Sequence, residues 1–120
     1  MAEVEHFVAL PVDARNRPLG ELRLSVGGLS ACPVKPGDVF RALLREAAHG
    51  VIFAHNHPSG EPLPSEDDIE LTRRLEQAGG LLGVRVLDHI IIGREGYFSF
   101  LDAGLLVQGH ASLTPPSPRA

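Results

Sequence analysis

Two histidines separated by one residue, His55 and His57, are well suited by type and spacing to hold a metal ion. In an extended chain the side chains at i and i+2 point the same way, so both imidazoles could reach one point. Imidazole is the commonest metal ligand in proteins, although most H-x-H pairs bind nothing. The pair follows the apolar run VIFA (51–54), which predicts a strand. Sheets of α/β proteins tend to place their sites at the carboxyl ends of strands.

The segment that follows the histidines contains Ser65 and Asp68, and this pair has two interpretations. A serine with an acidic residue three positions later resembles a capping box at a helix start, with Asp in place of the usual Glu or Gln. Alternatively, Asp68 would join the two imidazoles and a water in an arrangement known from catalytic zinc sites. A carboxylate that is not a ligand would then carry the proton of that water to the leaving group.

Seven elements are predicted to position these residues. Apolar runs and alternation predict strands at 6–13, 19–26, 51–54, 83–93 and 96–100. Helical periodicity predicts helices at 36–50 and 65–80, which we expect Gly50 and Gly79-Gly80 to end. This order predicts an α/β (α+β) fold, a mixed β-sheet flanked by helices. We expect one domain over residues 1–113 and a disordered C-terminal tail at 114–120.

Composition limits the partners that fit this sequence. The 120 residues carry a net charge of -4, and the 11 Lys and Arg residues are scattered, which does not favour direct nucleic-acid binding. The single cysteine, Cys32, excludes an internal disulfide framework and a CxxC metal knuckle. The acidic start lacks the pattern of a secretory leader, and no apolar run reaches the roughly 20 residues that cross a bilayer. We expect a cytoplasmic protein without membrane contact.

The spacing His55-x-His57, seven residues, Ser65-x-x-Asp68 resembles the JAMM (MPN+) metalloprotease signature. HNHPSG (55–60), the PSxxD that follows it, LDHIIIG (87–93) and YFSF (97–100) are similar to the RadC branch of that superfamily, over roughly residues 4–107. The resemblance implies a JAB/MPN deaminase-like fold. It also implies one Zn²⁺ per chain with a bound water, held by His55, His57 and Asp68. Ser65 would help to stabilise the oxyanion.

The resemblance also implies a glutamate near the first strand that acts as general acid and base. The candidates are Glu3, Glu5, Glu21 and Glu46. The family context, a glutamate just before an apolar strand, matches EHFVAL (5–10) and favours Glu5. Without the resemblance, Glu5 would be interpreted as a solvated charge.

Two other segments bear on the comparison with RadC proteins. Asp88-His89 recurs in the family, and we expect a hydrogen-bonded structural pair rather than metal ligands. RadC proteins usually carry a helical N-terminal region, whereas this sequence starts directly with the catalytic-type domain, and Pro36-Gly37-Asp38 stands where the family often has a basic motif.

These expectations favour a zinc-dependent metallohydrolase, a peptidase or isopeptidase that cleaves an amide bond in an unidentified peptide or protein substrate. The alternative is a non-catalytic RadC-like interaction module involved in DNA repair or maintenance. A nucleobase deaminase is set aside, because its Pro-Cys-x-x-Cys ligands need two cysteines and the sequence has one. The apolar strands near either end could pair in a homodimer.

Overall fold

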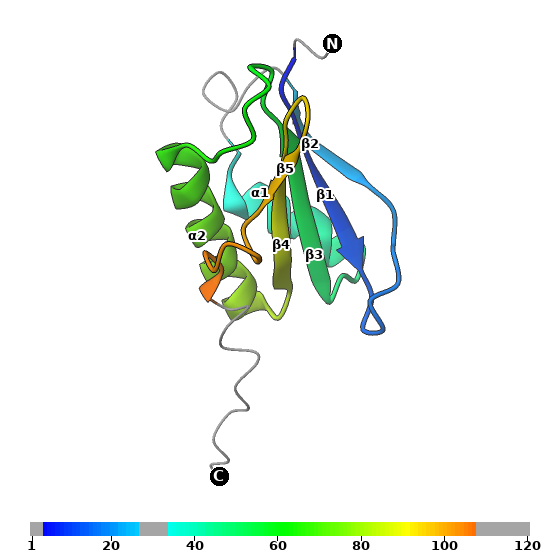
Figure 1. Ribbon diagram of the computed structural model, residues 1–120. Helices are drawn as coiled ribbons and strands as arrows, with labels where there is room; N and C mark the ends of the chain where they lie inside the picture. The colour runs from blue at the N-terminus through cyan, green and yellow to red at the C-terminus, as the bar shows by residue number, and fades with distance from the viewer. Residues whose placement is uncertain (1–3, 27–33, 108–120) are drawn as a thin grey trace.

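The computed structural model describes residues 4–26 and 34–107 (Figure 1). Its elements are β1 (His6–Val12), β2 (Leu22–Val26), α1 (Pro36–Arg45), β3 (Gly50–Asn56), α2 (Glu66–Leu82), β4 (Arg85–Ile92) and β5 (Tyr97–Ser99). The strands form one sheet in the order β2-β1-β3-β4-β5. Only β3 and β4 run parallel among these neighbours, and the other pairs are antiparallel. The predicted element order and the mixed sheet are confirmed.

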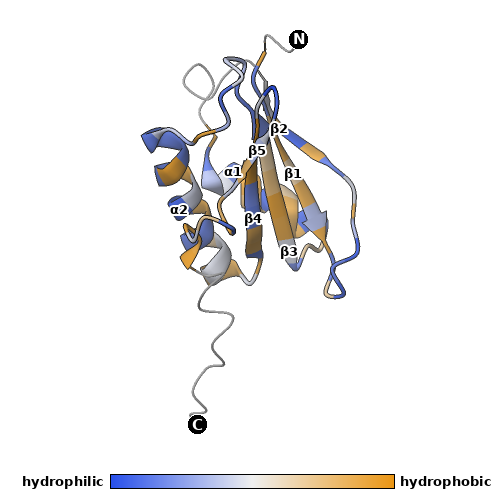
Figure 2. Ribbon diagram, viewed as in Figure 1, coloured by the Kyte–Doolittle hydropathy of each residue, from blue (hydrophilic) through white to orange (hydrophobic). Residues whose placement is uncertain are grey.

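The core lies on one face of this sheet. Along β1 and β3 the residues Phe7, Ala9, Val51 and Phe53 are fully buried, while those between them are only partly buried. The buried set also includes Val39, Phe40 and Leu43 of α1 and Leu75 of α2. Both helices therefore cover the same face, and α1 lies behind the strands in Figure 1. Figure 2 shows hydrophobic and hydrophilic residues alternating around α2, as expected for a helix with one covered side.

Both predicted helix ends were wrong, because neither Gly50 nor the pair Gly79-Gly80 ends a helix. Helix α1 ends at Arg45, since Ala47 takes a left-handed conformation with φ 57°. Helix α2 continues through Gly79 to Leu82 and ends at Gly83, whose φ of 78° is the left-handed cap. At Gly79 a Cβ would lie 2.2 Å from the carbonyl oxygen of Val84, so glycine there permits close packing.

Strand bounds differ from the prediction where the site is built. Strand β3 extends past Ala54 to Asn56, which places His55 inside the sheet. Strand β2 starts at Leu22, three residues after the predicted start. Neither helix of the described ranges is long and apolar enough to cross a membrane. The predicted tail at 114–120, Cys32 and Glu3 lie outside the described residues.

Candidate metal centre

Strand pairing brings the first candidate residues together. Strand β1 runs antiparallel to β3 and places Phe7 opposite His55, with their ring centroids 5.5 Å apart. The chain entering β1 therefore lies at the carboxyl end of β3. Glu5 precedes Phe7 by two residues and faces the same side of the sheet. The result is that Glu5 and His55 meet, although they are far apart in the sequence.

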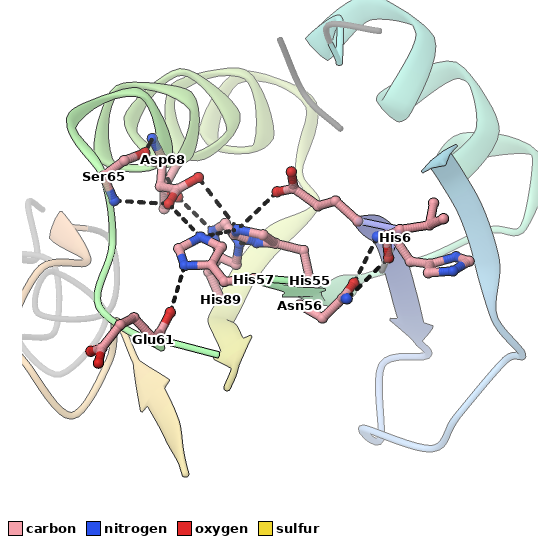
Figure 3. A network of polar contacts seen from close by, with 11 residues as sticks. His6, His55, Asn56, His57, Glu61, Ser65, Asp68 and His89 are labelled. Atoms are coloured by element: carbon pink, nitrogen blue, oxygen red, sulfur yellow. Dashed lines mark hydrogen bonds and ion pairs between the residues drawn. The ribbon is translucent and has the colours of Figure 1, made fainter. Parts of the chain in front are cut away.

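Four side chains converge at this end of the sheet, those of Glu5, His55, His57 and Asp68. Figure 3 shows His55, His57 and Asp68 pointing toward one another. His55 Nε2 lies 3.1 Å from His57 Nε2 and 3.3 Å from Asp68 Oδ1. His57 Nε2 lies 3.0 Å from Asp68 Oδ2, and Glu5 Oε2 lies 3.7 Å from His55 Nε2. His55 and Asp68 are buried, whereas His57 and Glu5 are partly exposed. The family resemblance implied this grouping of His55, His57 and Asp68, whereas spacing alone left capping and ligation open.

The spacing of these atoms fits a tetrahedral zinc site. Nitrogen and oxygen ligands at roughly 2.0–2.1 Å from a tetrahedral ion lie about 3.3 Å from one another. The contacts among His55, His57 and Asp68 range from 3.0 to 3.3 Å. Glu5, His55 and His57 also form a group whose ligand atoms lie within 4.8 Å of one another. Both sets share the two imidazoles, and Asp68 makes the shorter contacts with them.

The loop after β3 determines which nitrogen of His57 carries its proton. His57 Nδ1 lies 2.8 Å from the backbone oxygen of Glu61. A carbonyl oxygen only accepts hydrogen bonds, so Nδ1 is the donor and the Nε2 of a neutral ring carries the lone pair. The loop turns back at Gly60, whose φ is 93° and whose N–H donates to the oxygen of His57. His57 therefore presents a lone pair toward Asp68 and His55.

Ser65 and Asp68 form the predicted capping box. The Asp68 N–H donates to Ser65 Oγ at 3.1 Å, and the Ser65 N–H donates to Asp68 Oδ2 at 2.8 Å. The same Oδ2 faces His57, so capping and ligation do not compete for position. Ser65 Oγ accepts in the cap, which leaves its own proton to donate. Burial raises the pKa of Asp68, but the contact with the His55 imidazole and the hydrogen bond from the Ser65 N–H outweigh it and hold that pKa well below 3.8.

Asn56 holds the segment that carries Glu5. Its side chain points away from the two histidines, as alternation along a strand predicts, and accepts from the N–H of His6 at 2.7 Å. Its Nδ2 donates to the backbone oxygen of Val4 at 3.1 Å. These bonds fix both sides of Glu5, and Figure 3 shows Asn56 directed toward His6.

Strand pairing also separates Glu5 from the other glutamate candidates within the described residues. Glu21 lies next to Leu22, which pairs with Ala9, further along β1 from the site. Glu46 caps the end of α1 and precedes Gly50, at the opposite end of β3 from His55. Glu5 is therefore the described candidate that reaches the cluster.

Asp88 and His89, predicted to form a hydrogen-bonded structural pair, make different contacts in the structure. Asp88 accepts from the N–H groups of His89 and Leu101 and from Ser99 Oγ, at 2.6–2.9 Å, so its hydrogen-bonded structural task is confirmed. His89 is fully buried and contacts His55 Nδ1 through Nε2 at 2.8 Å and Thr72 Oγ1 through Nδ1 at 2.6 Å. Burial of the ring lowers the pKa of His89 to about 3.

Sequence reasoning missed Thr72 altogether. Its position four residues after Asp68 places both side chains on one face of a helix, which is the signal that could have identified it.

A groove of about 450 Å³ adjoins the cluster on the side of His57. Pro58 and Gly60 of the loop after β3 and Ile92 and Arg94 at the end of β4 form its walls. A second hollow of about 360 Å³ shares Gly60 and Arg94 with it. Both hollows therefore lie beside the loop that follows His57.

Comparison with known proteins adds a family match and close relatives. The model of the RadC-like JAB domain family matches residues 1–105. A UPF0758 protein of Syntrophotalea carbinolica is 55% identical over 102 residues, and one of Geobacter sulfurreducens is 51% identical over the same length. These matches cover 85% of this chain but only 45% and 44% of the relatives. The chain thus spans less than half the length of these curated relatives.

Proposed function

Because the chain belongs to the RadC-like JAB domain family, we propose that it is a zinc-dependent metallohydrolase that cleaves an amide bond in a peptide or protein. The observation that carries the proposal is the meeting of His55 Nε2, His57 Nε2 and the Asp68 carboxylate at 3.0–3.3 Å, with Glu5 beside them. A zinc ion held there would act as a Lewis acid on a carbonyl and lower the pKa of a water toward roughly 7.

Each residue of the cluster has a task that its contacts support. His55, His57 and Asp68 hold the ion, and the cap at Ser65 orients the Asp68 carboxylate through the Ser65 N–H. Glu5 accepts a proton from the attacking water and delivers it to the leaving nitrogen, since its carboxylate is close to His55 yet 19% exposed. The Ser65 hydroxyl would donate to the carbonyl oxygen as it becomes an oxyanion during the addition of water.

The groove beside His57 supports an extended peptide as substrate. It is open at the surface and includes the side chain of Ile92, which is 49% exposed, together with Pro58. Ligand grooves typically combine an apolar lining with a few polar groups that fix orientation. A segment of peptide lying there would bring a backbone carbonyl next to the metal ligands.

Two substitutions test the proposal on the full chain purified without chelators. Glu5→Gln keeps about one zinc per chain by elemental analysis but lowers cleavage of a mixed peptide library, followed by mass spectrometry, by about 10²–10⁴-fold. His57→Ala loses both zinc and cleavage. Glu21→Gln is the matched control, because Glu21 is exposed and lies away from the cluster. Cleavage by Glu5→Gln at the unaltered rate would contradict the assigned task, and zinc binding without any cleavage would favour the non-catalytic interaction module.

A further inference from the structure

A single line of hydrogen bonds lies behind the candidate metal centre. His55 Nδ1 contacts His89 Nε2 at 2.8 Å, and His89 Nδ1 contacts Thr72 Oγ1 at 2.6 Å. Thr72 Oγ1 then contacts the backbone oxygen of Asp68 at 2.8 Å. The line joins β3, β4 and α2, and we call these four groups the relay.

The far end of the relay fixes its direction. The Asp68 carbonyl oxygen only accepts, so the Thr72 hydroxyl donates its one proton to it. Thr72 Oγ1 has no second proton, and it must therefore accept from His89. His89 Nδ1 is consequently the nitrogen that carries hydrogen.

The surroundings of His89 determine which ring donates in its hydrogen bond with His55. The His89 ring is fully buried, stacks on Phe100 with centroids 4.8 Å apart and meets the rings of Phe7 and Phe53 edge-on. An apolar pocket disfavours a charged imidazolium, so the ring is neutral and has one N–H. Because that N–H is at Nδ1, His89 Nε2 accepts, and His55 Nδ1 must donate to it.

We propose that Thr72 and His89 are positioning residues that hold His55 as the Nδ1–H tautomer, so that its Nε2 lone pair faces the metal centre. This inference rests on the proposed metal site. With the tautomer that Glu61 imposes on His57, two lone pairs and the Asp68 carboxylate point at one place. Three electron-pair donors repel one another unless a cation lies among them. The relay therefore prepares the donor set before any metal arrives.

Replacing Thr72 by valine tests the relay with almost no change of shape. Without the hydroxyl, His89 Nδ1 has no acceptor, and the His89 proton moves to Nε2 and is donated to His55 Nδ1. His55 then carries its own proton on Nε2, where it opposes metal binding. Two-bond ¹H–¹⁵N spectra of the metal-free full chain should show His55 as Nδ1–H, and as Nε2–H in Thr72→Val. Zinc affinity, measured by chelator competition, should fall about 10- to 100-fold.

Two further variants separate this task from general support of the fold. Thr72→Ser keeps the hydroxyl and should preserve both the tautomer and the zinc affinity. Ser99→Ala removes another buried hydroxyl, which donates to Asp88, and should lower stability without moving either measurement. If Thr72 acted only through packing, the changes in zinc affinity would instead follow the loss of stability in all three variants.

The tautomer of His55 in the unaltered chain tests the proposal even if Thr72→Val does not fold. An unprotonated Nδ1 at His55 would overturn the proposal, as would a Thr72→Val chain that keeps both tautomer and zinc affinity. Failure to cleave peptides would count against the proposed hydrolase and leave these measurements unchanged. His55 found as Nδ1–H in a chain that binds no zinc would support the relay and reject the metal centre.

Discussion

Replacing Asn56 by alanine tests how Glu5 is held beside the proposed metal centre. The Asn56 side chain accepts from the His6 N–H at 2.7 Å and donates to the Val4 oxygen at 3.1 Å. Each bond contributes roughly 0.5–1.5 kcal/mol net, so losing both weakens the attachment of this segment by about 1–3 kcal/mol. Since about 1.4 kcal/mol is a factor of ten, the released population of the segment should rise about 5- to 150-fold.

Amide hydrogen exchange at His6 measures this release directly, because the His6 N–H is one of the two groups that Asn56 binds. Exchange should accelerate by the same factor. Peptide cleavage should fall, because Glu5 spends less time beside His55, while zinc affinity should not change. Asp13→Ala is the control at the other end of β1: its carboxylate accepts from the N–H groups of Arg15 and Arg17 and pairs with the Arg17 side chain, and the substitution removes all three contacts.

Accelerated exchange at His6 with an unchanged cleavage rate would show that Glu5 does not act from the position that Asn56 secures. Unchanged exchange would show that Asn56 does not secure it. A similar effect in the Asp13 variant would mean that the whole of β1 was disturbed rather than its entry.

Three further outcomes are expected. Gly79→Ala should lower the free energy of unfolding in urea by about 1–3 kcal/mol or more, since its Cβ would meet the Val84 oxygen; Gly80→Ala, exposed on the same helix, should raise it by about 1 kcal/mol. Because the pKa of His89 is lowered in the folded chain, the unfolded chain takes up a proton on His89 at a higher pH than the folded chain does. The stability that neutral His89 contributes is therefore complete above pH 6.5 and is lost as the pH falls toward 3. Denaturant titrations of the metal-free protein should show a slope of up to about 1.4 kcal/mol per pH unit that His89→Gln reduces. Ile92→Glu should raise KM for apolar peptides and leave kcat and zinc content unchanged, and an unaltered KM would exclude the groove as the substrate path.

Local patterns made much of the fold predictable. Alternating and helical apolar positions identified all seven described elements in order, because each must bury one side. The helix ends were not predictable from glycine alone. Gly79 looks like a helix stop, yet its task depends on the distance to Val84, which only the folded chain defines.

The candidate site was predictable where its residues lie close in the sequence. The spacing of His55, His57 and Asp68 allowed their meeting and the family resemblance indicated it, whereas the contact of His89 with His55 could not be predicted from alternation. Strand pairing shifts register between Val51 and Ile52, so that His89 joins the buried face of β4 three residues after Val86. A strict two-residue period would place His89 on the opposite face.

The different sequence separations of the site residues have a consequence for the order of folding. The three proposed ligands lie within residues 55–68, and closing so short a segment costs little chain entropy. Glu5 reaches them only when β1 pairs with β3, a contact between residues about fifty positions apart. A chain in which β3 and α2 have met, but β1 has not yet paired, would hold the full ligand set and lack the proton carrier. If the proposed function holds, metal capture would precede hydrolytic competence, which would require the non-local pairing of β1 with β3.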